Sequence, residues 1–159
     1  MNEKKEKNHV WIAWIFFIIY MVFLMYFLFF AEITGRTYVE RDYHYNLIPF
    51  REIKRFIVYR EQLGKFAVCT NLFGNVAAFI PFGTVLPMLM KKSRNFFRIT
   101  LYSFEFSLFV EIAQLVSKVG SFDVDDLFLN TLGGAIGYLL FGLLCYLGRK
   151  DYEEKKKSL

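Results

Sequence analysis

Four long apolar runs dominate the pattern of this chain, and polar residues gather between them and at their ends. The runs cover about residues 10–31, 66–90, 99–119 and 127–147. The first has no charged side chain between Val10 and Ala31. At a rise of about 1.5 Å per residue, a run of this length crosses a hydrocarbon core of about 30 Å. The pattern therefore predicts an all-α integral membrane protein with four transmembrane helices, folded as a single domain over residues 1–159.

Residues 32–65 connect the first two predicted spans, and they are too many for a loop without structure of its own. Apolar side chains recur at close to helical spacing in the second half of this connection: Ile53, Phe56, Ile57 and Leu63. With charged residues on the other faces, this spacing predicts a short amphipathic helix in the membrane interface. Pro49 disfavours helix at Ile48, so residues 43–50 are predicted to be extended or re-entrant.

Composition and charge set the class of protein and its orientation. The chain is 55% hydrophobic and 20% aromatic, which is too apolar for a soluble domain of this size. Its net charge of +5 does not indicate nucleic acid, because the basic residues lie at the ends of the predicted helices. Twelve lysines and arginines fall on the side of the termini and of the 91–98 loop, and eight on the side of residues 32–65. The positive-inside rule then predicts a multi-pass protein with both termini and the 148–159 tail in the cytoplasm.

The two cysteines fall in different predicted spans. Cys69 is near the outer end of the second span, and Cys145 is near the inner end of the fourth. Their Cα atoms would lie much further apart than the roughly 7 Å that a disulfide allows. We therefore predict two free thiols.

Acidic and amide side chains interrupt three of the predicted spans or lie at their outer ends. Residues spaced three or four apart share a helix face, and this spacing recurs in three sets. The sets are Asn71 with Asn75, then Ser103, Ser107, Glu111 and Gln114, and then Asp126 with Asn130, while Asp123 and Asp125 lie just before the fourth span. Clustered carboxylates repel one another unless a cation or proton intervenes. The pattern therefore predicts a polar site near the external surface; the alternative is that these groups only hydrogen-bond the helices together.

Four sequence motifs occur in an order that resembles the VanZ family. They are NLIPF from Asn46, NLFGNVAAFIPFG over 71–83, the Glu111-x-x-Gln114 pair, and FDVDDLFLNTLGGAIGY over 122–138. The resemblance covers about residues 44–140 and implies a small protein of the bacterial cytoplasmic membrane. It also implies a link to low-level resistance to teicoplanin-type lipoglycopeptides, drugs that act on cell-wall precursors at the outer leaflet.

One feature departs from the family pattern. Members often have an arginine just before the FDxxD element, where this chain has Gly120 and Ser121. A role of that arginine towards an anionic group therefore has no direct counterpart here, unless Lys118 substitutes for it.

The favoured hypothesis is a VanZ-like membrane protein with an outer-leaflet-facing polar cavity. The cavity would engage a lipid-linked or amphiphilic ligand, such as a membrane lipid, a cell-wall precursor or a lipoglycopeptide, and so contribute to drug tolerance. Arginines would meet phosphates near the headgroups: Arg36, Arg41, Arg51 and Arg55. The ligand-binding candidates are Asn46, Arg51, Asn71, Asn75, Glu111, Gln114, Asp123, Asp125, Asp126 and Asn130.

Two alternatives remain open. The first is a metal-dependent hydrolase or transferase acting on a lipid or cell-wall precursor, with Glu111 and Asp126 as catalytic candidates. Asp123, Asp125 and Asp126 would hold a divalent cation, since hard oxygen ligands suit magnesium, calcium or manganese. No other cofactor is evident in the sequence. The second alternative is a small proton-coupled carrier that uses Glu111. The sequence leaves open the ligand, enzymatic activity and the oligomeric state.

Overall fold

The computed structural model describes residues 2–34, 43–90, 92 and 94–157. Four of its helices are long and apolar enough to cross a membrane, over Trp11–Phe29, Val68–Leu89, Phe96–Ser117 and Val124–Lys150. The all-α class with four candidate membrane helices is therefore confirmed. The elements in chain order are α1 (Asn2–Thr34), β1 (Tyr45–Asn46), α2 (Arg51–Val58), α3 (Arg60–Leu63), α4 (Lys65–Leu89), α5 (Phe96–Ser117), β2 (Phe122–Asp123) and α6 (Val124–Lys157).

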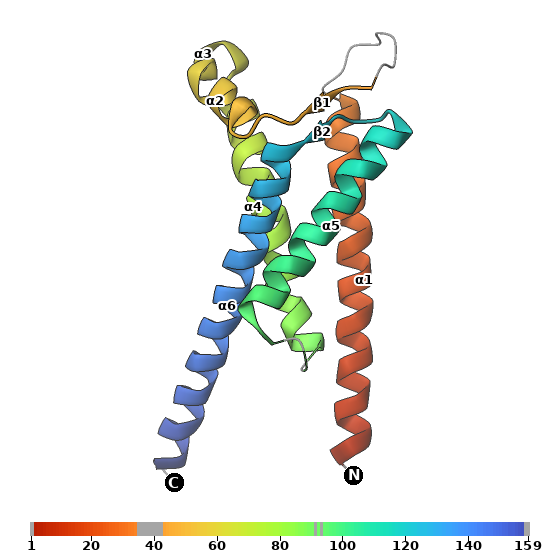
Figure 1. The fold of residues 1–159 in the computed structure, drawn as a ribbon. Coiled ribbons are helices and arrows are strands. Elements are labelled where there is room, and N and C mark those ends of the chain that lie inside the picture. Colours follow the sequence, from red (N-terminus) through yellow and green to blue (C-terminus); the bar gives the residue numbers. More distant parts are fainter. Residues whose placement is uncertain (1, 35–42, 91, 93, 158–159) are drawn as a thin grey trace.

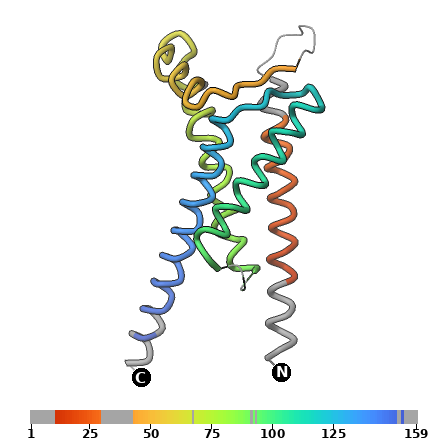
Figure 2. Tube along the Cα trace, viewed as in Figure 1, coloured from red at the N-terminus to blue at the C-terminus, as the bar shows by residue number. Residues whose placement is uncertain are grey.

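The four long helices run side by side, and both ends of the chain lie at the same end of the bundle (Figure 1). Strands β1 and β2 and helices α2 and α3 lie together at the opposite end, which we call the distal end. The trace in Figure 2 shows the same arrangement, with the α4–α5 connection on the side of the termini. An even number of crossings places the termini on one side, as the sequence predicts.

Helices α4 and α6 approach each other closely because glycines line their contact. A Cβ atom added at Gly83 would overlap the carbonyl of Gly134, and one added at Gly137 would overlap the carbonyl oxygen of Ile80. The Thr84 hydroxyl donates to the carbonyl oxygens of both Ile80 and Gly137, at 2.9 Å each. Gly133, Gly134 and Gly137 of the fourth span therefore serve helix packing, as small residues do in membrane helices.

Helix α5 turns its polar stripe inwards. Ser103, Ser107, Glu111 and Gln114 are all buried, which confirms the helical face read from their spacing. Helix α5 starts three residues before the predicted span 99–119 and ends two residues before its predicted end. At the start of α5, the Asn95 carboxamide accepts from the amides of the second and third residues, and at its end the chain turns through a left-handed residue.

Helix α1 packs beside α4 and α5 mainly through apolar side chains. Phe17, Leu24 and Leu28 are buried in this contact. Two polar links accompany them. The Tyr20 hydroxyl donates to the carbonyl oxygen of Ala78, and Gln114 Nε2 donates to that of Leu28 at 3.2 Å. Gln114 therefore fastens α1 to α5.

The connection between α1 and α4 contains a short extended strand and two short helices, where the sequence predicts one amphipathic helix. β1 pairs with β2 in parallel, with Tyr45 opposite Phe122 and Asn46 opposite Asp123. Helices α2 and α3 follow, and neither contains a buried residue. Their position in a membrane interface stays a prediction.

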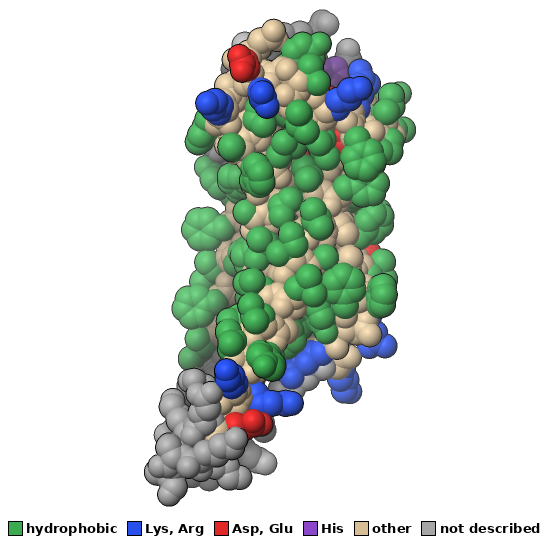
Figure 3. Space-filling view, turned by 90° about the vertical axis from the view of Figure 1, so that its left-hand side faces the viewer, with side chains coloured by type: hydrophobic (Ala, Val, Ile, Leu, Met, Phe, Trp, Pro, Cys, Tyr) green, Lys and Arg blue, Asp and Glu red, His purple; other side chains and the backbone are tan. Residues whose placement is uncertain are grey.

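The surface of the molecule fits four membrane-crossing helices. On the face that Figure 3 presents, hydrophobic side chains cover the middle of the molecule, and lysines and arginines lie towards both ends. Cys69 and Cys145 are both exposed and unpaired, so the prediction of two free thiols is confirmed.

Candidate functional site

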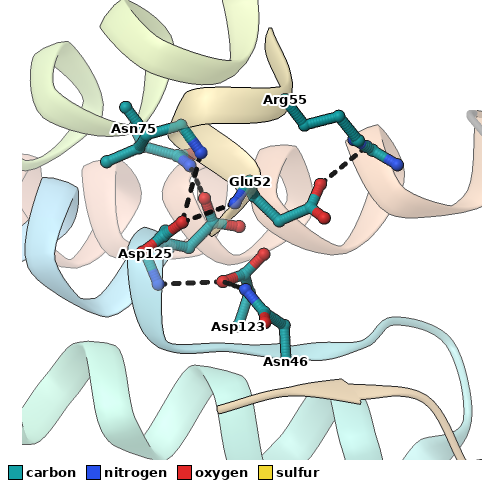
Figure 4. Close-up of polar contacts among 8 residues, drawn as sticks. Asn46, Glu52, Arg55, Asn75, Asp123 and Asp125 are labelled. Atoms are coloured by element: carbon teal, nitrogen blue, oxygen red, sulfur yellow. Dashed lines mark hydrogen bonds and ion pairs between the residues drawn. The ribbon is translucent and has the colours of Figure 1, made fainter. Parts of the chain in front are cut away.

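Polar side chains gather in the interior of the distal half of the bundle. Of the ten ligand-binding candidates, six are buried: Asn46, Glu111, Gln114, Asp123, Asp125 and Asn130. Asn75 and Asp126 are partly buried, while Arg51 and Asn71 are exposed. We call Asn46, Asn75, Glu111, Asp123, Asp125, Asp126 and Asn130 the distal cluster. Its members come from β1, α4, α5, β2 and α6 (Figure 4 shows part of it).

Asp123 caps helix α6. Its Oδ1 atom accepts from the backbone amide of Asp125 at 2.8 Å and from Asn46 Nδ2 at 3.1 Å. This cap explains why α6 begins at Val124, about one turn before the predicted start of the fourth span. Asp125 and Asp126 thus lie in the first turn of the helix, where the helix dipole favours negative charge.

The environment of Asp123 disfavours its charged form. Burial raises the pKa of this carboxyl group above its ordinary value, and the negative charges of Asp125 and Glu52 raise it further. The two amide donors from Asp125 and Asn46 lower the pKa but do not cancel the effect of burial. Asp123 therefore carries its charge at a free-energy cost.

Asp125 caps a different helix from its own. Helix α2 begins after Phe50, which is left-handed with φ 63° and gives the helix no side-chain cap. Both Asp125 oxygens supply that cap. Oδ1 accepts from the amide of Phe50, and Oδ2 accepts from the amide of Ile53 at 3.1 Å. Oδ2 also accepts from the amide of Glu52 at 2.8 Å (Figure 4). The Phe50 ring also stacks on that of Phe128. The segment before α4 is thus fastened onto the start of α6.

Glu111 joins α5 to β2. Its Oε2 atom accepts from the backbone amide of Asp123 at 2.8 Å, although the residue is only 3% exposed and lies within an apolar helix. This bond closes the tight connection between α5 and α6. Glu111, the most prominent site candidate in the sequence, therefore lies where α5 and α6 are connected.

The deeper part of the distal cluster lies between α4, α5 and α6. Asn75 Nδ2 donates to Asp126 Oδ1 at 2.6 Å, and Asn130 Nδ2 donates to Ser107 Oγ at 2.9 Å. Asn130 is 1% exposed, and its Oδ1 atom has no hydrogen-bond donor in the described part of the chain. A buried amide oxygen without a donor costs about 1–3 kcal/mol.

Two basic residues of the distal end, Arg55 and Lys118, have partners outside the distal cluster. Arg55 forms an ion pair with Glu52 at 2.7 Å (Figure 4), and the ammonium group of Lys118 lies over the Tyr43 ring at 4.5 Å. The predicted arginines Arg36 and Arg41 lie outside the described residues. Lys118 thus faces an aromatic ring here.

The sequence did not predict the hydrogen-bond donors of these carboxylates. The hydrogen-bond partners of Asp125 are backbone amides of Phe50, Glu52 and Ile53, which no side-chain pattern marks. The available signals were Pro49 shortly before the predicted helix and the acidic pair after Asp123. They did not reveal that residues 75 positions apart would meet.

The metal hypothesis has no direct support from the geometry. Within residues 2–34, 43–90, 92 and 94–157, no group of three or more histidine, cysteine, aspartate or glutamate side chains is placed to hold a metal ion. The divalent cation stays a prediction, as do the catalytic roles of Glu111 and Asp126. The predicted cavity also stays a prediction.

Comparison with known proteins agrees with the motifs. The family model described as VanZ/LLP1 matches residues 17–145. Protein VanZ of Enterococcus faecium is 34% identical over 86 residues, which make up 54% of this chain. The match spans 50% of that relative's own length. No solved structure matches the chain.

Proposed function

This chain belongs to the VanZ/LLP1 family, and on that premise we propose that its distal cluster binds the polar part of a lipid-linked or amphiphilic ligand at the outer leaflet. Binding there contributes to tolerance of teicoplanin-type lipoglycopeptides. The ligand is a membrane lipid, a lipid-linked cell-wall precursor or the drug itself.

The observation that carries the proposal is the burial of the distal cluster at the end opposite the termini. Glu111 is 3% exposed, Asp125 1% and Asn130 1%, although they belong to or adjoin helices that are apolar enough to cross a membrane. Ionisable groups at such depth are expensive, and in membrane proteins they mark functional sites by default. Hydrogen-bonded packing alone would be satisfied by amides and hydroxyls, without several carboxylates.

The α2–α3 segment gives the distal cluster a membrane-facing neighbour. Ile57 is 53% exposed and Phe50, just before the segment, is 63% exposed, while Ile53 and Phe56 are partly buried. Arg51, Lys54 and Arg60 carry positive charge. An amphipathic segment of this kind lies in the interface and attracts anionic headgroups. In the proposal, Asp125 holds the α2–α3 segment next to the distal cluster, so that a bound ligand contacts both the segment and the cluster.

Charge-removing variants test the proposal. We expect Glu111→Gln and Asp126→Asn to lower teicoplanin tolerance of cells that depend on this protein, while membrane abundance stays near that of the wild type. Each replacement is isosteric and keeps hydrogen-bonding capacity. The matched control is Glu105→Gln, which removes an exposed carboxylate from the same helix α5 and should leave tolerance unchanged.

Two outcomes would count against the proposal. Wild-type tolerance in both variants would mean that the carboxylates serve only the fold. Stabilisation of purified protein by magnesium or manganese, lost in Asp126→Asn, would favour the metal-dependent enzyme instead.

A further inference from the structure

Glu105 lies on the outward face of α5, near the middle of a helix that is long enough to cross a membrane. The four candidate spans contain the acidic residues Glu105, Glu111, Asp125 and Asp126, and of these Glu105 is the exposed one. It lies about 14 Å along α5 from Phe96, while the whole helix of 22 residues is about 33 Å long. A carboxylate that faces lipid at this depth is expensive and is rarely left without a partner.

The Glu105 carboxylate has no ion pair or hydrogen bond within residues 2–34, 43–90, 92 and 94–157. Arg98 is the basic residue on the same helix, about 10 Å away along the helix axis. Its Nη1 atom donates to the carbonyl oxygen of Lys92 at 3.1 Å. Away from their ends, the four described spans contain no lysine or arginine. A partner for Glu105 therefore has to come from outside this part of the chain.

The side chains around Glu105 form an apolar stripe along α5. Leu101, Phe109, Ile112 and Val116 follow at spacings of three or four residues, so they share the face of Glu105, and all four are exposed. The buried polar side chains of α5 lie on the opposite face. We call these five residues the α5 stripe. Its one hydrogen-bonding group suits a second membrane helix that offers a hydrogen-bonding group at the same depth.

We propose that the α5 stripe binds a second copy of this chain, with the Glu105 side chains of the two copies hydrogen-bonded to each other. A two-fold axis along the membrane normal brings the same residue of both copies to the same depth, so Glu105 meets Glu105. Two adjacent carboxylates repel each other, and the pair therefore holds at least one proton, whose O–H donates to the facing oxygen. A carboxyl group is thus its own complement at this interface.

Disulfide cross-linking locates the contact. In a background with Cys69 and Cys145 replaced by serine, Ile112→Cys places a thiol on the α5 stripe, two helical turns from Glu105. Oxidation with copper phenanthroline in membranes should give a covalent dimer, because the symmetric contact brings the two thiols within disulfide range. The matched control is Leu132→Cys, an exposed position on α6, which should stay monomeric. Non-reducing electrophoresis measures both.

Energy transfer between labelled copies in phosphatidylcholine liposomes measures the strength of association over a series of protein-to-lipid ratios. Glu105→Leu should lower the association constant about tenfold, because it removes the hydrogen-bonding atoms from the interface. Glu105→Gln keeps a donor and an acceptor, so its association constant should stay within about twofold of the wild type. This agrees with its use as a neutral control for drug tolerance. Glu61→Leu removes an exposed carboxylate from α3 and should have no effect on association.

Three outcomes would overturn the proposal. A wild-type monomer at every protein-to-lipid ratio would leave lipid or a different membrane protein against the α5 stripe. Association that Glu105→Leu does not weaken would place the contact elsewhere, as would cross-linking of Leu132→Cys without that of Ile112→Cys. Melting temperatures identify any variant that fails to fold, and the Ile112→Cys test retains Glu105 and does not depend on Glu105→Leu. The proposed function is tested separately, by Glu111→Gln and Asp126→Asn.

Discussion

At the scale of single residues, the carboxylates of the distal cluster hold the fold as well as forming the candidate site. Asp123 shows the balance between the two. Its carboxyl oxygen accepts from Asp125 and Asn46, while burial raises its pKa above the ordinary value. A raised pKa means that the native state binds a proton more tightly than the unfolded chain does. Stability from this group is therefore full below its unfolded pKa and is lost as pH rises through the folded pKa.

Asp123→Asn tests this balance. The asparagine keeps the acceptor oxygen and removes the buried charge, so the variant should melt at or above the wild-type temperature at neutral pH, with the difference shrinking towards acid pH. Asp123→Ala leaves the amide donors of Asp125 and Asn46 unmet and should lose about 1–3 kcal/mol of unfolding free energy. Melting temperatures in detergent between acid and neutral pH would decide, and a less stable asparagine variant at neutral pH would contradict the argument.

A second prediction at this scale concerns the capping role of Asp125. Because it supplies the cap that α2 lacks, Asp125→Ala should free the amides of Glu52 and Ile53 and weaken the attachment of α2 by about 1–2 kcal/mol. Hydrogen–deuterium exchange should accelerate in residues 50–58 and stay unchanged in α5. Glu61→Ala, at an exposed site in α3, is the control. Unchanged exchange in α2 would show that the cap is dispensable.

At the scale of elements, the contact between α4 and α6 sets how closely the polar groups can meet. Gly83→Ala and Gly137→Ala should each destabilise the protein by about 1–3 kcal/mol, because the added methyl group meets backbone atoms of the facing helix. Gly142→Ala, where a Cβ atom meets nothing, should be neutral or gain up to about 1 kcal/mol from helix propensity. Thermal unfolding in detergent would measure all three. If all three substitutions changed the unfolding free energy equally, the glycines at the α4–α6 contact would not be what limits the packing of these helices.

The elements themselves were predictable where periodicity is strong. The four spans follow from uninterrupted apolar runs, and the buried face of α5 follows from the spacing of Ser103, Ser107, Glu111 and Gln114. What could not be predicted is the pairing of β1 with β2 and the capping of α2 by Asp125. Both rest on backbone groups brought together by the tertiary fold, so no local sequence pattern records them. Because no local pattern marks these backbone donors, the sequence predicted that the carboxylates face a ligand. It did not predict that they also accept hydrogen bonds from backbone amides.

At the scale of the whole molecule, the arrangement of the helices and the distribution of charge together set the orientation in the membrane. Both termini lie at one end and the distal cluster at the other (Figure 1). Twelve lysines and arginines belong to the terminal side and eight to the distal side, so the positive-inside rule predicts that the distal cluster lies outside the cell. An external position is what a role at the outer leaflet requires.

Thiol labelling tests this orientation. In a background with Cys69 and Cys145 replaced by serine, Gln62→Cys places a thiol on the exposed α3, and Glu153→Cys places one on the exposed end of α6. A membrane-impermeant maleimide should label the first variant in intact cells and the second only after the cells are opened. Neither change alters the lysine and arginine count on which the prediction depends. The reverse labelling pattern would put the distal cluster in the cytoplasm, out of reach of ligands at the outer leaflet, and the proposed function would fail with it.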